Sequence, residues 1–351
     1  MDDYEYKEME IGPIRPPSEA DSLLLRVTRN CTWNKCKFCG LYKGQKFSAR
    51  SVDEIKADID RAALYGSGIL NLPPGGAESV FLQDANTMVL TYDKLREILI
   101  YLRKRLPGVK RVTSYGRADS LMKFSVEQLT GLREAGLDRI HSGYESGSDK
   151  VLALLNKGFT KEHEIEAGRK VKASGIELSV YYMPGAGGKG LSDDNAAETA
   201  DVISKVNPDF VRIRTFVPVP GTGIMEDIQN GSIKECTDTE KMLELKKMIE
   251  NIDGADGYLY SDHIINLLED VNGNMSADRE KMLLKFDAFE KLGVREQRMY
   301  QAARRMGYVR SLSDMELLGG DLLGAIDTYL EQFDDENEFE EFLLGFLRRY
   351  I

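Results

Sequence analysis

The sequence predicts an α/β fold in which helices cover a parallel sheet. Strand and helix signals alternate six times between residues 22 and 216, which is typical of consecutive β-α units. With 351 residues, the chain is long enough for one large barrel-type domain with an appendage, or for two ordinary domains. No G-x-G-x-x-G sequence follows the first strand, so a dinucleotide-binding sheet has no specific support. The alternation leaves two closures open, a doubly wound open sheet and a barrel.

The elements of the first half follow from short apolar runs and helical periodicity. An apolar strand at residues 22–28 leads into a cysteine-rich loop. Ser51 forms a capping box with the glutamate three positions later, which predicts the start of a helix that ends near Gly66. Residues 67–79 are expected to form a loop, with a strand at 68–72 as the alternative. The next expected elements are strands at 79–83, 110–115 and 137–142 and helices at 92–106 and 125–135.

The second half continues the alternation and then changes character. Its expected elements are helices at 161–174 and 193–206 and strands at 176–183 and 209–216. From Asn230 onward helical patterns dominate, with helices expected at 238–252, 276–292 and 295–306 and along an amphipathic run at 321–350. We therefore expect three regions, an N-terminal arm, a barrel-type region and a helical C-terminal extension, at residues 1–20, 21–230 and 231–351.

Composition narrows the class of protein. The formal net charge of -11 argues against a nonspecific nucleic-acid binder and against a protein that binds anionic membrane surfaces. No apolar stretch is long enough for a membrane span, and the acidic start MDDYEYKEMEIG is unlike a secretory signal. Of the 4 cysteines, three are clustered, which is a poor disulfide framework. These features predict a cytoplasmic protein.

The three clustered cysteines predict a metal site. They lie in Cys31-Thr-Trp-Asn-Lys-Cys36-Lys-Phe-Cys39, a C-x4-C-x2-C motif. Three thiolates on one loop favour an iron-sulfur cluster over zinc, which prefers a fourth Cys or His, and the histidines are far away in sequence. In a 4Fe-4S cluster they would leave one iron without a protein ligand. The same spacing also occurs in plant-type 2Fe-2S ferredoxins, for which only Cys236 could be the fourth ligand.

At these residues the chain resembles the radical S-adenosylmethionine (SAM) enzymes, whose usual signature is C-x3-C-x2-C with an aromatic residue before the last cysteine, here Phe38. This chain has one extra residue between its first two cysteines. The resemblance implies a partial (β/α)6 barrel with a helical C-terminal extension, and a 4Fe-4S cluster held by Cys31, Cys36 and Cys39. It also implies that SAM binds the open iron, with Phe38 beside the adenine. Flavodoxin or ferredoxin then supplies an electron that cleaves SAM to a 5′-deoxyadenosyl radical, which abstracts a substrate hydrogen.

Further residues are candidates for holding the nucleotide. The segment Gly143-Tyr-Glu145-Ser146-Gly147 resembles the Gly-x-Glu-Ser-Gly segment of the family branch related to coproporphyrinogen oxidase and the methylthiotransferases. This resemblance implies nucleotide contacts from Glu145 and Ser146. By position after expected strands, it also implies that Asp84 contacts the methionyl amino group and that Tyr182 opens the turn beside the adenine. The alternatives are a turn with a helix cap after Glu145 and an Asx turn at Asp84.

Other polar residues at strand ends are candidates for substrate binding. Arg212 and Arg214 alternate with apolar residues, so both are expected to face the lumen and bind an anion, either a phosphate or a carboxylate of substrate or SAM. The alternative is that they pair with carboxylates as structure. Tyr115 and Arg117 are further lumen candidates. His141 lies on a strand and is more typical of a hydrogen-bonded core histidine than of an acid-base group.

The functional expectation is a single-cluster radical SAM enzyme, an oxygen-sensitive oxidoreductase acting on a small anionic molecule. Cys236, the one cysteine outside the motif, cannot supply a second cysteine-ligated cluster, which argues against a methylthiotransferase, and no D-x-H-x-x-G cobalamin signature is present. The sequence does not specify the substrate. Two other classes stay open, an iron-sulfur electron-transfer protein and a regulatory protein that binds the cluster or the nucleotide without turnover.

Overall fold

The computed structural model describes residues 9–70, 77–333 and 335–350. The chain divides into two compact units. The first unit comprises Met1–Asn34, Leu41–Gly143 and Glu166–Ser179, and the second comprises Lys35–Gly40, Tyr144–Ile165 and Val180–Ile351. The boundaries of these two units differ from those of the three regions expected from sequence. The three regions therefore stay a prediction.

The strands of the main sheet follow one another in chain order. Hydrogen-bonded neighbours run β1-β4-β5-β6-β7-β8-β9-β10. The ladders β1–β4, β4–β5, β5–β6 and β8–β9 are parallel, and β9–β10 is antiparallel. A doubly wound sheet reverses its strand order part-way, whereas this order runs in one direction, as in barrel-type folds. The strands are β1 Leu23–Arg26, β4 Ser79–Gln83, β5 Arg111–Tyr115, β6 Arg139–Glu145, β7 Glu177–Tyr182, β8 Phe210–Ile213, β9 Tyr258–Tyr260 and β10 Asn272–Asn274; β2 Thr28–Arg29 and β3 Ser48–Ala49 form a separate antiparallel pair.

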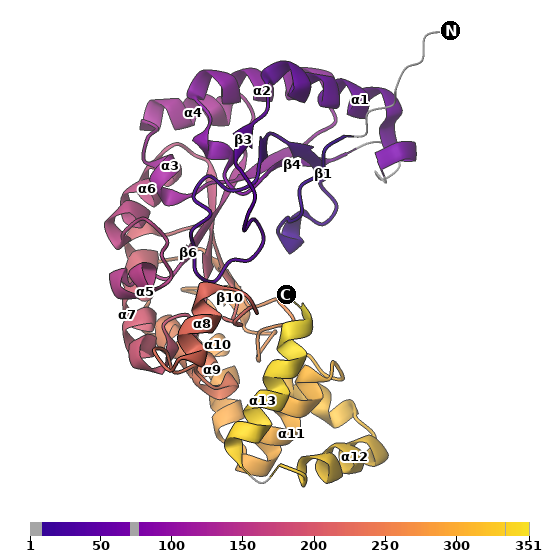
Figure 1. The fold of residues 1–351 in the computed structure, drawn as a ribbon, viewed down its shortest axis with the longest axis vertical. Helices are drawn as coiled ribbons and strands as arrows, with labels where there is room; N and C mark the ends of the chain where they lie inside the picture. The colour runs from indigo at the N-terminus through magenta and orange to yellow at the C-terminus, as the bar shows by residue number, and fades with distance from the viewer. Residues whose placement is uncertain (1–8, 71–76, 334, 351) are drawn as a thin grey trace. The chain divides into compact units, whose positions relative to one another are not determined.

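Helices connect the parallel strands, as the sequence predicts for an α/β fold. In the first unit α2 packs against α1 and α4, and in the second unit α11 packs against α12 and α13 (Figure 1). The helices are α1 Val52–Leu70, α2 Tyr92–Arg105, α3 Ala118–Leu121, α4 Val126–Glu134, α5 Asp149–Leu154, α6 Lys161–Ala173, α7 Gly188–Val206, α8 Gly223–Gln229, α9 Asp238–Asn251, α10 Arg279–Glu290, α11 Val294–Arg305, α12 Gly320–Leu330 and α13 Glu336–Leu347. Short 3-10 turns lie at Pro17–Glu19, Thr87–Val89, Leu312–Leu317 and Arg348–Tyr350.

The first unit matches most of its predicted elements. The Glu54 amide N–H donates to Ser51 Oγ at 3.2 Å, and the Ser51 amide N–H donates to Glu54 Oε2 at 2.7 Å, so the predicted capping box is present. The helix that it starts runs to Leu70, past the predicted end near Gly66, because a glycine weakens a helix without having to end it. Residues 71–76 of the predicted loop lie outside the described residues.

The C-terminal extension is not made of helices alone. β9 and β10 lie within it, and β9 pairs in parallel with β8, which places Leu259 opposite Val211. Leu259 is fully buried between two more exposed tyrosines, the alternation of a half-buried strand, but three residues are too few for periodicity to detect. The expected run at 321–350 divides into α12 and α13, because Asp335 caps a new helix by accepting from the Asn337 amide N–H at 2.7 Å.

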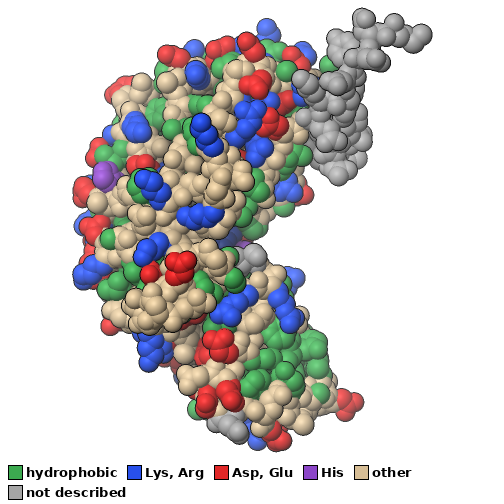
Figure 2. Space-filling model, viewed as in Figure 1, with side chains coloured by type: hydrophobic (Ala, Val, Ile, Leu, Met, Phe, Trp, Pro, Cys, Tyr) green, Lys and Arg blue, Asp and Glu red, His purple; other side chains and the backbone are tan. Residues whose placement is uncertain are grey.

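Two surface features complete the fold. No helix among the described residues is long and apolar enough to cross a membrane. On the face drawn in Figure 2, charges of both signs are interspersed, and apolar side chains gather over the C-terminal helices. Exposed apolar residues of this region are Leu317, Tyr329 and Tyr350.

Candidate functional site

The start of the cysteine loop lies in the first unit, where two asparagines shape it. Asn30 and Asn34 have φ angles of 66° and 49°, a left-handed conformation that asparagine tolerates better than most residues. Asn34 Nδ2 donates to the carbonyl oxygens of Tyr42 and Gln45 at 2.5 and 3.2 Å. The Asn34 amide N–H donates to Cys31 Sγ at 3.4 Å. Asn34 therefore links Cys31 to the later part of the loop.

Asp84 anchors the entry to this loop. Its side chain is buried, and Oδ2 accepts from the Asn30 amide N–H at 2.9 Å and from Arg26 Nη2 at 3.0 Å. The Tyr42 hydroxyl donates to Oδ1 at 3.4 Å. Asp84 therefore holds the backbone directly before Cys31, a role that neither a nucleotide contact nor an Asx turn describes. Its predicted contact with the methionyl amino group stays a prediction.

The end of the cysteine loop lies in the second unit, clamped between two helices. The Lys37 amide N–H donates to the carbonyl oxygen of Leu155 at 2.9 Å, and the Ile224 amide N–H donates to the carbonyl oxygen of Lys37 at 3.1 Å. Phe38 then packs against a buried apolar cluster, with Cys36 buried and Cys39 partly exposed on either side of it. That cluster consists of Val151, Leu155, Met183, Ala186, Phe216 and Ile224.

Lys157 links two residues that the sequence analysis selected separately. Its side chain is 5% exposed, and Nζ lies 3.3 Å from Glu145 Oε1. The same Nζ lies over the rings of Phe38 and Phe159, at 5.6 and 5.1 Å from their centroids. Glu145 ends β6 with a φ of 67°, which is uncommon for a residue other than glycine. The structure thus brings Phe38 and Glu145 together on one buried ammonium group, which no sequence motif indicated.

A second buried carboxyl, that of Glu164, lies within the influence of the Lys157 charge. Burial raises the pKa of Glu164 well above its usual range, although the charge of Lys157 opposes this rise. Its two carboxyl oxygens have no hydrogen-bond partner among the residues that the structure describes. The carboxyl of Glu164 is therefore harder to ionise than a free glutamate, and the ion pair of Lys157 at 3.3 Å is with Glu145.

The residues after Glu145 form the turn with a helix cap that was given as the alternative. Ser146 is buried, and its Oγ accepts from the Ser148 amide N–H at 2.9 Å. Ser148 caps α5 by accepting from the Val151 amide N–H at 3.4 Å. A Cβ atom on Gly147 would lie 2.4 Å from the carbonyl oxygen of Glu198 in α7. Glycine is needed here for helix packing, and a nucleotide contact by Ser146 stays a prediction.

Tyr182 faces a helix that the sequence analysis did not connect to the site. It is 1% exposed, and its hydroxyl donates to Glu244 Oε1 at 2.8 Å. The same oxygen accepts from the Gly185 amide N–H at 2.9 Å and from Asn195 Nδ2 at 2.7 Å, and Oε2 accepts from Ser192 Oγ at 2.6 Å. Burial raises the pKa of both Tyr182 and Glu244. Glu244 on α9 therefore fixes the turn after β7, and a contact between Tyr182 and the nucleotide stays a prediction.

The remaining candidates have different environments. Arg212 and Arg214 point to the same side, as period-2 alternation predicts, and both face the carboxylate of Asp262. His141 is fully buried with Nε2 3.2 Å from Glu19 Oε1, so its predicted place as a hydrogen-bonded core residue is confirmed. In the first unit Arg117 lies over the ring of Trp33 from the cysteine loop, 5.5 Å from the centroid.

The free cysteine side chains can serve as metal ligands, but the described side chains are not arranged as a complete metal site. All four cysteines are described, and they form no disulfide. No group of three or more His, Cys, Asp or Glu side chains in the described part of the chain is arranged to hold a metal ion. Cys236 differs from the motif, because burial raises the pKa of its thiol to about 12. A thiol that resists ionisation is a poor metal ligand at neutral pH.

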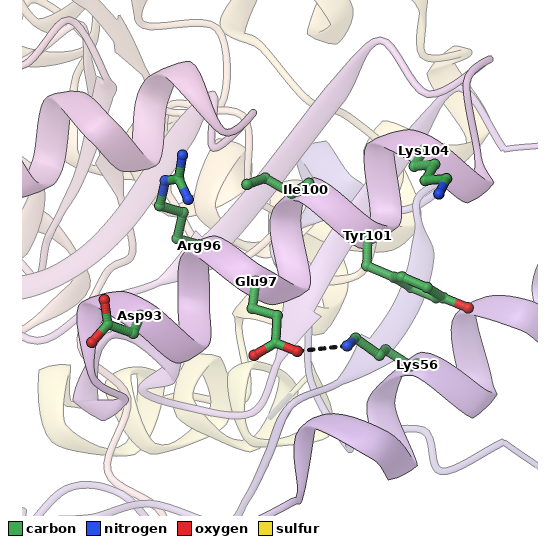
Figure 3. Close-up of a pocket in the computed structure, with 7 residues that line it drawn as sticks. All are labelled: Lys56, Asp93, Arg96, Glu97, Ile100, Tyr101 and Lys104. Carbon is green, nitrogen blue, oxygen red and sulfur yellow. Dashed lines mark hydrogen bonds and ion pairs between the residues drawn. The ribbon is translucent and has the colours of Figure 1, made fainter.

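A surface groove of about 450 Å³ lies between α1 and α2 (Figure 3). Lys56 and Glu97 form an ion pair across it at 2.5 Å. All its lining residues come from these two helices, whereas ligands of parallel β/α folds bind at the carboxyl ends of strands. We therefore do not assign the groove as the active site.

The chain is similar to known proteins over a large part of its length. A profile of the radical SAM superfamily matches residues 25–203, about half of the chain. An uncharacterized methyltransferase of Pyrococcus horikoshii is 25% identical over 208 residues, which are 58% of this chain and 41% of that protein. The tRNA-2-methylthio-N(6)-dimethylallyladenosine synthase of Aquifex aeolicus is 26% identical over 64% of this chain and 50% of its own length.

Solved structures are similar only in part. Coproporphyrinogen III oxidase of Escherichia coli, described as a radical SAM enzyme, aligns with a TM-score of 0.49 at 15% identity, over 65% of this chain and 51% of that one. The chain spans about half the length of the curated relatives that it matches.

Proposed function

Because the chain belongs to the radical SAM superfamily, whose enzymes use a 4Fe-4S cluster and SAM, we propose that it is a single-cluster enzyme in which Cys31, Cys36 and Cys39 ligate the cluster. When bound, the cluster supplies the electron that cleaves SAM to methionine and a 5′-deoxyadenosyl radical. Three thiolates from one loop match the donor set of such a cluster. Oxygen sensitivity and a cytoplasmic location follow from this proposal as expectations.

The arrangement around Lys157 is the observation that carries the proposal. Phe38 lies one residue before Cys39, and Glu145 ends a central strand, so the buried ammonium joins the cysteine loop to the strand end. We propose that Phe38 contacts the adenine and that Glu145 accepts a hydrogen bond from the nucleotide. In this arrangement Lys157 holds both side chains in position. Asp84, Ser146 and Tyr182 are also proposed to contact SAM, and each of them takes part in hydrogen bonds that stabilise a turn or loop.

The substrate is proposed to be a small anionic molecule. The similar synthase is named for a tRNA product, but the chain covers only part of it, and that activity is not transferred here. Methylthiotransferases need a second cluster, and Cys236, the one cysteine of this sequence outside the motif, has a buried thiol. The net charge of -11 also disfavours a polyanionic substrate.

We propose that flavodoxin or ferredoxin is the reductant. Residues 31–50 carry five basic residues and no acidic one, in contrast to the acidic chain as a whole. Lys43 and Lys46 are exposed, and Leu41 beside them is 53% exposed. Basic groups around an exposed apolar side chain suit an acidic electron carrier. Reduction by flavodoxin should therefore slow as ionic strength rises.

The decisive experiment is anaerobic. The cluster is reconstituted, SAM and dithionite are added, and 5′-deoxyadenosine is quantified by chromatography. Cys36→Ala should abolish its formation, and Cys236→Ala, the matched control with a buried cysteine outside the motif, should retain it. A cluster with the spectrum of a 2Fe-2S centre and no cleavage of SAM would favour the electron-transfer protein. Cluster and SAM binding without cleavage would favour the regulatory alternative.

A further inference from the structure

Two guanidinium groups of the second unit share one carboxylate beyond the ends of neighbouring strands. Arg212 lies on β8, Arg214 follows this strand, and Asp262 follows β9. Nη1 of Arg212 lies 3.6 Å from Asp262 Oδ2, and Nη1 of Arg214 lies 3.7 Å from Asp262 Oδ1. Each oxygen of the carboxylate faces a different arginine. The space between the two arginines therefore accepts an anion with two oxygens.

The contacts between Asp262 and the two arginines are long. The side chains of Arg212 and Arg214 are 6% and 15% exposed, and both carry their charge at any physiological pH. Both distances to Asp262 are longer than a hydrogen bond, whereas a strong arginine–carboxylate pair has two direct N–H···O bonds. Nε of Arg212 has no hydrogen-bond partner among the described residues. Asp262 is thus held more loosely than the carboxylate of a strong arginine–carboxylate pair.

Aromatic rings pack against both arginines. Arg212 lies over the ring of Tyr260 at 5.0 Å, and Arg214 lies over the ring of Tyr181 at 5.5 Å from the centroid. The pKa of the neighbouring His263 responds to these charges. Its pKa is lowered to about 4, first by burial and then by the charge of Arg214. The charge of Arg304 also lowers this pKa, whereas the charge of Asp262 raises it.

We propose that Arg212 and Arg214 bind a carboxylate or phosphate group of a small-molecule ligand, and that Asp262 occupies this site until the ligand displaces it. The Asp262 side chain is 41% exposed, so it can turn into solvent when an anion enters. The tethered carboxylate competes with every incoming anion. Because two arginines face the site, a dianionic group is favoured over a monoanionic one in this competition. This inference deepens the proposed function, on which it rests, by naming the substrate class.

The first test uses inorganic phosphate as the probe. The melting temperature of the reconstituted protein is measured as phosphate replaces chloride at constant ionic strength, and the apparent Kd is taken from the rise. Asp262→Asn should bind phosphate about tenfold more tightly than the unmodified protein, because the tethered competitor is removed. Arg212→Gln should lose the response. Asp193→Asn, a matched control in the same unit with a side chain 88% exposed, should respond like the unmodified protein.

Equal phosphate responses in the unmodified protein, Asp262→Asn and Arg212→Gln would overturn the proposal, as would the absence of any response in Asp262→Asn. Because Asp262 is exposed, this variant should fold even if Arg212→Gln does not. Phosphate binding needs no turnover. The result is therefore independent of whether 5′-deoxyadenosine is formed, and failure of one proposal is distinguishable from failure of the other.

A second arm identifies the source of the anion. The affinities of SAM and of 5′-methylthioadenosine, which lacks the methionyl carboxylate, are compared by equilibrium dialysis. If the site binds the SAM carboxylate, Arg212→Gln should weaken SAM about tenfold or more and leave 5′-methylthioadenosine unchanged. If the site binds the substrate, neither affinity should change, while phosphate should still bind in the presence of saturating SAM.

Discussion

Replacing Glu244 should separate its role as a hydrogen-bond acceptor from the cost of burying its charge. In Glu244→Ala, the buried donors of Tyr182, Gly185 and Asn195 lose their common acceptor. Each unpaired buried donor costs about 1–3 kcal/mol. Part of this loss is offset, because the desolvation that raises the pKa of Glu244 is also removed. We therefore expect a net loss of roughly 3–5 kcal/mol in the free energy of unfolding.

Glu244→Gln is the matched control. The amide oxygen keeps the position of Oε1 and accepts the same three hydrogen bonds, and the amide NH2 donates to Ser192 Oγ, whose hydroxyl can turn to accept. We expect a loss of less than about 1.5 kcal/mol. Urea unfolding followed by far-UV circular dichroism measures both variants. Equal midpoints for Glu244→Ala and the unmodified protein, or equal losses in both variants, would refute the reasoning.

Three other predictions test separate parts of the chain. Burial and the charge of Asp238 raise the pKa of Glu340 to about 7. The neutral form of Glu340 therefore contributes to the free energy of unfolding in full below pH 4.5, and this contribution is lost as pH rises through 7. The loss is on the order of 3 kcal/mol. Glu340→Gln should therefore reduce the change of the urea midpoint with pH between pH 5 and 8. An unchanged pH dependence would contradict this prediction. Ser51→Ala should lower the free energy of unfolding by about 1 kcal/mol, whereas no shift would mean that α1 does not need its cap. With a thiol pKa of about 12, Cys236 should resist iodoacetamide at pH 8 in the native protein, and early labelling seen by mass spectrometry would contradict its burial.

The sequence predicts the fold where each element carries its own signal. The parallel strands are continuous apolar runs because both faces are covered, as at Val80, Phe81 and Leu82, which are all nearly or fully buried. Helix starts are visible where a capping box forms. The direction of strand winding is not a local property, so the alternation of elements left a barrel and a doubly wound sheet open, and the family resemblance selected the barrel.

The expectations that failed have local physical reasons. β9 is too short for its alternation to be detected, and its stability comes from pairing with β8. The helix α7 begins at Gly188, five residues before the expected start, because its first turn is rich in glycine and gives no capping signal. A Cβ atom at Gly188 would lie 2.7 Å from the carbonyl oxygen of Lys234, which explains the glycine.

The candidate site was predictable only as a set of separate residues. The motif identified the cysteines and Phe38, and the resemblance identified Glu145. Lys157 was missed, because its contact with the distant Phe38 and its ion pair with Glu145 depend on packing that no sequence spacing encodes. Glu244 was missed for the same reason, since on its helix it reads as one more polar position.

Under the proposed function, the buried pair of Glu145 and Lys157 serves activity at the expense of thermal stability. Glu145 keeps a left-handed backbone at a cost of about 1 kcal/mol relative to glycine, and buried ion pairs are often no more stable than apolar replacements. Laboratory evolution that selected only for survival at high temperature would therefore be expected to recover Glu145→Gly together with Lys157→Met. Under the proposed function, the resulting protein would be more stable to heat and catalytically inactive.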